Sequence, residues 1–166
     1  AAGLWFLHVG PAAAADHFYC VDQSGSVADF SLCPGAVPCA SGTYSSIADA
    51  LAAASVMPST DTHDLCVRSP APHVESVDID RSVLGASLHL GFSPETFDAA
   101  QDSVFCGDPG APAGEPILTL DGSAAPDPGQ QTLVTGWDHR DAACAGPSRP
   151  LVKIIQADAE LRVLRA

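Results

Sequence analysis

Four successive stretches decide the fold: Tyr44-Ser-Ser-Ile-Ala-Asp-Ala-Leu-Ala-Ala-Ala54, Asp64-Leu-Cys-Val-Arg68, His73-Val-Glu-Ser-Val-Asp-Ile79 and Ser87-Leu-His-Leu-Gly91. The first has the apolar spacing of an amphipathic helix. The other three alternate apolar and polar residues, as short strands do. Together they predict one helix followed by strands.

The helix is predicted between Thr43 and Ala54. Ser45 or Ser46 can cap its N-terminus, Asp49 suits the first turn, and Pro58 stops it. One face carries the apolar residues Ile47, Ala50, Leu51 and Ala54.

From residue 64 onward the apolar period is two, and Pro, Gly and Ser interrupt it. Eight short strands are predicted, around Leu65–Val67, Val77–Ile79, Leu88–Leu90, Val104–Phe105, Ile117–Leu120, Leu133–Val134, Leu151–Ile155 and Leu161–Leu164. They indicate an all-β body. Periodicity alone leaves two architectures open, a sandwich and a β-helix.

The order of these stretches resembles the entry to a right-handed parallel β-helix of the pectin-lyase-like proteins. In that family a capping helix precedes a strand, a segment that ends in Tyr or His, any residue and Glu, and then further strands. Pro72-His-Val-Glu75 stands here in place of the usual Gly-x-Tyr-x-Glu. The resemblance covers 43–91 well and 103–164 only loosely. It implies an all-β, right-handed parallel β-helix with an N-terminal capping α-helix, and a β-sandwich with antiparallel strands is the alternative.

The resemblance carries further expectations. Coils of roughly 40 residues would place Cys66, Cys106 and Cys144 at comparable positions, so a Cys66–Cys106 bridge between neighbouring coils is expected. A β-helix that stopped at 166 would have an open apolar edge. We therefore expect a fragment of a longer protein, or a partner stacked on that end. The Ca²⁺-binding acids and catalytic Arg or Lys of pectate-lyase-like enzymes match no residue here, and none is carried over.

The chain divides into three segments. Residues 1–15 combine an apolar run with small residues around Ala13 and Ala15, which is typical of the remnant of a secretory signal peptide. A hydrophobic first strand is the alternative. Residues 16–42 are predicted to form a Cys-rich N-terminal cap, and the lack of sustained periodicity over 19–43 predicts loops there. Residues 43–166 hold the capping helix and the first coils.

The cysteine pattern predicts disulfides. None of the pairs has Cys-x-x-Cys spacing, and no His lies beside them at zinc-ligand intervals. Their even number favours an oxidising compartment, outside the cell or on its surface. At least one bridge is expected within the N-terminal group. The six residues are Cys20, Cys33, Cys39, Cys66, Cys106 and Cys144.

Composition excludes some partners. The 166 residues are 46% hydrophobic and carry a formal net charge of -13, with 20 acidic residues against 7 Lys plus Arg. No basic stripe exists that would neutralise phosphates, so nucleic acid is excluded as a partner. The apolar run near the N-terminus is too short to span a bilayer, which takes about 20 residues.

Asp78 and Asp80 are the candidate metal ligands. They flank Ile79 and point to the same face of a strand, where their carboxylates would suit Ca²⁺. The alternative is a solvated outer face without a ligand. No other cofactor is expected.

The densest polar cluster is Trp137-Asp138-His139-Arg140, followed by another aspartate. Asp138 and His139 would suit an acid/base pair, and Arg140 would suit a ligand carboxylate. On an exposed loop, Trp137 would stack on a sugar ring. The alternative is a charged loop tip without a ligand, with Trp137 as a packing residue. No catalytic constellation and no nucleophile motif is identified. We therefore expect a secreted or cell-surface protein with a structural, adhesive or glycan-binding role, whose partner is a polysaccharide or a surface protein. The alternative is the N-terminal part of a polysaccharide lyase or glycoside hydrolase whose catalytic coils lie beyond residue 166.

Overall fold

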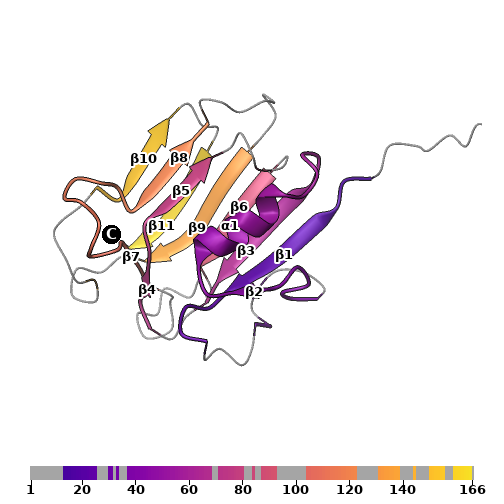
Figure 1. The fold of residues 1–166 in the computed structure, drawn as a ribbon, viewed down its shortest axis with the longest axis horizontal. Coiled ribbons are helices and arrows are strands. Elements are labelled where there is room, and N and C mark those ends of the chain that lie inside the picture. Colours follow the sequence, from indigo (N-terminus) through magenta and orange to yellow (C-terminus); the bar gives the residue numbers. More distant parts are fainter. Residues whose placement is uncertain are drawn as a thin grey trace, which may run out of the picture.

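The fold is built mostly of strands. The computed structural model describes residues 13–25, 30–31, 33, 37–68, 71–80, 84, 87–92, 104–122, 131–138, 144, 150–155 and 159–165. Its elements, labelled in Figure 1, are β1 (Asp16–Val21), β2 (Thr43–Tyr44), α1 (Ile47–Ser55), β3 (Thr62–Val67), β4 (His73–Val74), β5 (Val77–Asp80), β6 (Ser87–Phe92), β7 (Phe105–Cys106), β8 (Leu118–Asp121), β9 (Gln131–Asp138), β10 (Val152–Ile155) and β11 (Ala159–Arg165).

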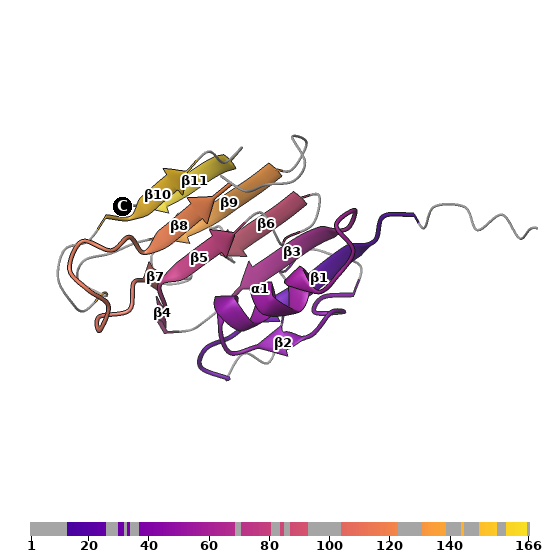
Figure 2. The ribbon, with the colours of Figure 1, turned by 45° about the horizontal axis from the view of Figure 1, so that its top comes forward.

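The strands form three parallel sheets. The first has the order β11-β9-β6-β3-β1-β2, the second β10-β8-β5 and the third β4-β7. The first three strands of the chain, β1, β2 and β3, all belong to the first sheet. After β3, strands of the second or third sheet come between successive strands of the first sheet. Figures 1 and 2 show the second sheet lying as a layer against the β6–β11 part of the first.

Every strand pair described is parallel, and β3 pairs with β1 and β6, not with β5. The antiparallel pairing that a β-sandwich requires is therefore missing from the described strands. All eight predicted strands are present. Three strands, β1, β2 and β4, were not predicted.

The core lies between the layers because alternate residues of each strand point inward. The first sheet contributes Leu65, Leu88 and Leu90, and the second contributes Ile79 and Leu120. All five side chains are buried. The alternation seen in the sequence thus corresponds to one buried and one exposed face.

The helix α1 covers the β1–β3 end of this core. The predicted apolar face is buried: Ile47, Ala50, Leu51 and Ala54 all lie against the core. Ser46 is the N-cap, and its side chain accepts a hydrogen bond from the Asp49 backbone N–H at 3.0 Å. The prediction of the helix is confirmed, with its end at Ser55.

The loops predicted over 19–43 are wrong at their start, because β1 occupies Asp16–Val21 and reaches into that stretch. β1 lies between β2 and β3 in the first sheet. The alternation is obscured here because an inward position is taken by His17, in register with the buried His63 of β3. For the predicted signal-peptide remnant, residues 1–12 lie outside the described residues. Ala15 joins the fold through its carbonyl, which accepts the Thr62 N–H at 2.9 Å.

Three disulfides join Cys20 to Cys39, Cys33 to Cys66 and Cys106 to Cys144, and no cysteine is free. The bridge expected within the N-terminal group is Cys20–Cys39. The Cys66–Cys106 prediction is wrong. Cys66 belongs to β3 of the first sheet and Cys106 to β7 of the third, so the two positions are not equivalent.

Candidate functional site

The candidate site lies on the outer face of the second sheet. Its inward residues, such as Ile79 and Leu120, are buried, and the alternate residues point away from the core. Asp78 and Asp80 are both exposed on this outer face, as the sequence predicts. The face is polar because its six outward positions carry three carboxylates, one hydroxyl, one ammonium and one isoleucine.

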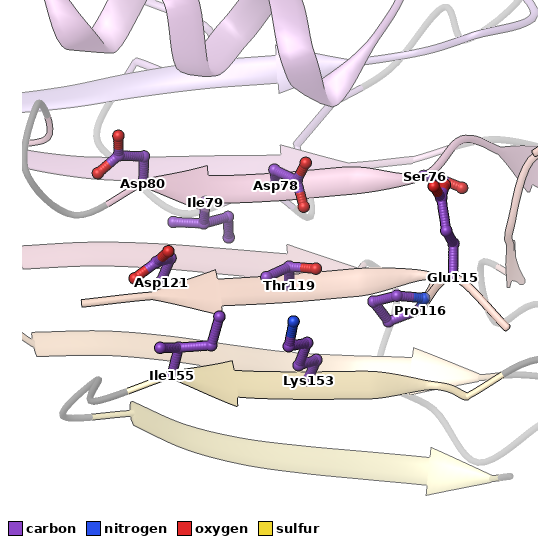
Figure 3. A pocket seen from close by; sticks show the side chains of 10 residues that line it. All are labelled: Ser76, Asp78, Ile79, Asp80, Glu115, Pro116, Thr119, Asp121, Lys153 and Ile155. Carbon is purple, nitrogen blue, oxygen red and sulfur yellow. The ribbon is translucent and has the colours of Figure 1, made fainter. Parts of the chain in front are cut away.

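Parallel pairing places these side chains in two rows across the sheet. The first row runs from Asp78 through Thr119 to Lys153. Neighbouring strands lie about 4.8 Å apart, so groups in one row can touch the same small ligand. In Figure 3 the Lys153 side chain points along the row toward Thr119.

The second row runs from Asp80 through Asp121 to Ile155. It is set about 7 Å along the strands from the first, which is two residues of extended chain. Two carboxylates from neighbouring strands therefore stand side by side at this end of the site (Figure 3).

The two rows line a hollow of about 470 Å³. Ser76, Glu115 and Pro116 close its other end, beyond the Asp78 row (Figure 3). This volume falls in the range of small-molecule sites. The lining is mixed, and all described lining residues other than Ile79, Pro116 and Ile155 are polar or charged.

The electrostatics of the hollow follow from its composition. Asp78, Asp80, Asp121 and Glu115 contribute four carboxylates, against the single ammonium of Lys153. Such a surface repels polyanions unless a cation intervenes. It can accept hydrogen bonds from many hydroxyl groups at once, and Lys153 adds up to three donors.

The structure brings Asp78 and Asp80 together with three residues that the sequence did not single out: Thr119, Asp121 and Lys153. Their common signal is position within successive strands of the second sheet. Lys153 is the only lysine of the chain, and this was the clearest signal in the sequence that could have pointed to the site. It becomes informative only once the register of β10 on β8 is known.

A calcium site at Asp78 and Asp80 stays a prediction. Among the described residues, no three or more His, Cys, Asp or Glu side chains are grouped closely enough to hold a metal ion. Ca²⁺ takes six to eight oxygen ligands. An ion bound at this pair would therefore depend on ligand oxygens or water for much of its coordination.

The predicted cluster Trp137-Asp138-His139-Arg140 is only partly described. Trp137 and Asp138 are the last residues of β9, so the prediction of an exposed loop is wrong for them. Trp137 pairs with Val163 of β11 just after a bulge, where Gly136 has φ 69°. Glycine suits that left-handed backbone. His139 and Arg140 lie outside the described residues.

Comparison with known proteins gives no match, whether to a protein family, to a curated protein or to a solved structure. Within the described part of the chain, no helix has the length and apolar character needed to cross a membrane. The three disulfides are compatible with an oxidising compartment.

Proposed function

We propose that the chain forms a secreted, right-handed parallel β-helix that binds glycans through the hollow on β5, β8 and β10, in a structural or adhesive role. The observation that carries the proposal is the in-register pair of polar rows, Asp78–Thr119–Lys153 and Asp80–Asp121–Ile155. A hollow lined with repeated acceptors suits a ligand that presents repeated hydroxyl groups.

Three features support the β-helix. All described strand pairs are parallel, successive passages of the chain add strands to the same sheets, and α1 covers the apolar end at β1 and β3. Parallel strands need long crossover connections. Here most of those connections contain strands of the other sheets rather than helices.

The charge of the hollow restricts the class of glycan that it can bind. With four carboxylates and one ammonium, neutral glycans fit better than polyuronates, which would need Ca²⁺ as a bridge. No aromatic ring is among the described residues that line the hollow. Recognition would therefore rest on hydrogen bonds to hydroxyl groups, which gives modest affinity per site and gains from repetition along a polymer.

The test is binding of the oxidised full chain to an array of neutral, acidic and amino-bearing glycans, with hits repeated by calorimetry. We expect neutral glycans to bind, with a loss of at least tenfold in the Asp80→Asn/Asp121→Asn double variant. Two hydrogen bonds to charged groups, each of about 1.5–3 kcal/mol, account for such a loss.

The single variants Asp80→Asn and Asp121→Asn have a matched control in Asp49→Asn, the same chemical change on the exposed side of α1. The control should leave binding unchanged. Equal losses in the single variants and in the control would show that overall charge, not the hollow, governs binding. Repeating the titration with EDTA and with Ca²⁺ separates the two ligand classes, because only polyuronate binding should depend on the ion.

The second candidate function is hydrolysis of the bound glycan. It is favoured by Asp80 and Asp121, which are in register on neighbouring strands. Their strand spacing of about 4.8 Å is close to the 5–5.5 Å that separates the two carboxyl groups of retaining glycosidases. Release of reducing ends from a glycan that binds, lost in Asp80→Asn and in Asp121→Asn, would support this function over simple binding.

A further inference from the structure

A second cluster of polar side chains lies where β1, β2 and β3 meet in the first sheet, on other elements than those of the hollow. It brings together Ser41 from the turn before β2, His17 from β1, and Asp61 from the residue before β3. These are a hydroxyl, an imidazole and a carboxylate. They come from three separate segments, and none of them belongs to a sequence motif.

The three side chains form one hydrogen-bonded series. His17 Nε2 lies 2.8 Å from Asp61 Oδ2, and His17 Nδ1 lies 3.5 Å from Ser41 Oγ. A carboxylate can only accept, so Nε2 carries the hydrogen and Nδ1 is left as the acceptor for the serine hydroxyl. This is the relationship of nucleophile, base and orienting acid that activates a serine, with the two ring nitrogens exchanged.

Backbone groups fix both ends of the series. Asp61 Oδ1 accepts the Ala15 N–H at 3.1 Å, and Ser41 Oγ accepts the Phe18 N–H at 3.2 Å. The bond from Phe18 occupies one lone pair of Ser41, which leaves its hydrogen free to point at His17. The distance between Ser41 and His17 is long, but such bonds often tighten only when substrate is present.

The surroundings of His17 and Asp61 suit a base and an orienting carboxylate. The His17 hydrogen bond, followed by the Ala15 backbone bond, holds the pKa of Asp61 below its usual value, so Asp61 stays ionised. The His17 ring stacks on His63 with centroids 5.3 Å apart, which holds its plane. The His17 side chain is 19% exposed and Asp61 is 7% exposed, so the base can be reached while the acid is shielded.

We propose that Ser41 is an activated nucleophile, with His17 as its general base and Asp61 as a positioning residue, and that it accepts acyl groups from small activated esters. In the first step, Ser41 Oγ bonds to the ester carbonyl carbon while its proton passes to His17 Nδ1. The bond to the leaving oxygen then breaks, and that oxygen takes the proton from His17. A water molecule then bonds to the acyl carbon while its proton passes to His17 Nδ1. The bond from that carbon to Ser41 Oγ breaks, Ser41 takes the proton back from His17, and the carboxylic acid leaves.

A purely structural role would use the same bonds to fasten β1 to its neighbours. The chain supplies a comparison, because Ser24 Oγ donates to Asp22 Oδ1 at 2.6 Å. The Ser24 hydroxyl thus donates its hydrogen to a carboxylate rather than to an imidazole. Chemistry at Ser41 that does not occur at Ser24 therefore distinguishes activation from fastening.

The experiment is labelling of the oxidised full chain with a fluorophosphonate, followed by mass spectrometry of peptides. Ser41 Oγ would displace fluoride from phosphorus, and His17 would take the proton. We expect one adduct, on Ser41. We also expect the unmodified chain to hydrolyse 4-nitrophenyl acetate. Both should fall at least tenfold in Ser41→Ala and in His17→Gln, since general bases contribute about 10²–10⁴-fold, and stay unchanged in Ser24→Ala.

Absence of an adduct on Ser41 in the unmodified chain, or equal labelling of Ser24, would overturn the proposal whatever the variants do. Thermal denaturation of each variant checks that lost labelling is not lost folding. For Asp61, the readout is rescue by the conservative variant. Labelling of Ser41 should fall in Asp61→Asn and return in Asp61→Glu, which keeps a carboxylate for His17 Nε2. A purely structural role would change the thermal stability of the variants without this difference in labelling.

Discussion

The Glu75 carboxylate lies against the first turn of α1, where its Oε2 accepts the backbone N–H of Ile47 at 2.8 Å. The other oxygen accepts the Ala48 N–H at the same distance. The buried His73 completes the arrangement, with Nε2 2.8 Å from Glu75 Oε2. A residue that follows β4 thus satisfies two N–H groups that a helix leaves without partners.

Replacing Glu75 by Gln is expected to lower the free energy of unfolding by about 1–3 kcal/mol, because one charge-assisted acceptor is lost at the helix N-terminus. The measurement is urea denaturation of the oxidised protein. Glu115→Gln is the control, since that glutamate is exposed in the segment before β8. An equal loss in the two variants would contradict the capping role.

The region around Glu75 illustrates how much the sequence predicts. The helix, its Ser46 cap and the inward direction of Ile79 follow from local spacing, and all three are present. The contact between Glu75 and α1 spans 27 to 28 residues. Local periodicity contains no information about such a contact.

The hollow was only partly predictable for a related reason. Alternation alone places Asp78 and Asp80 on one face, but their neighbours depend on register between strands. Asp78 and Thr119 are 41 residues apart, whereas Thr119 and Lys153 are 34 apart. Because the connections differ in length, no fixed repeat in the sequence aligns the row. The cluster around His17 was missed because its polar side chain takes an inward strand position, stabilised by Asp61 from a distant turn.

Asp61 should make the stability of the fold depend on acid pH. Its pKa is lower in the folded protein than the ordinary 3.8, chiefly through the His17 hydrogen bond. The stabilisation is therefore complete above pH of about 4 and is lost as the pH falls through the folded-state value. We expect Asp61→Asn to unfold with a weaker dependence on pH in that range. The measurement is the urea midpoint from pH 5 to 2, with Asp49→Asn as the control. If the urea midpoint depended on pH equally in both variants, the contact between Asp61 and His17 would be unimportant for stability.

The Tyr19 hydroxyl is expected to ionise at a higher pH than an exposed tyrosine. Burial, followed by the charges of Tyr44 and Asp61, raises its pKa from 10.0 to about 12. A raised pKa stabilises the fold below pH 10, and the contribution is lost as the pH rises toward 12. Tyrosinate absorbance should show this directly, because the chain has 2 tyrosines and Tyr44→Phe leaves only Tyr19. A midpoint near 10 in the folded variant would contradict the burial of this hydroxyl, and the same titration in denaturant supplies the reference.

The Cys33–Cys66 disulfide should contribute more than its loop length alone explains. Cys33 and Cys66 are 33 residues apart, and Cys106 and Cys144 are 38 apart. Loop-closure entropy therefore predicts a similar loss of about 4 kcal/mol for the removal of either bridge. Cys33 and Cys66 are, however, both buried, in a small cluster with Cys20 against which Phe30 packs, whereas at the other bridge Cys106 is buried and Cys144 is half-buried. Replacing Cys33 and Cys66 by Ser places two hydroxyls in that cluster, which adds a cost of about 1–3 kcal/mol each where no partner is found.

Urea denaturation of the two double Ser variants compares the bridges, and a non-reducing peptide map confirms the pairing. An equal loss at both bridges would mean that the packing around Cys33 and Cys66 adds nothing beyond the covalent constraint.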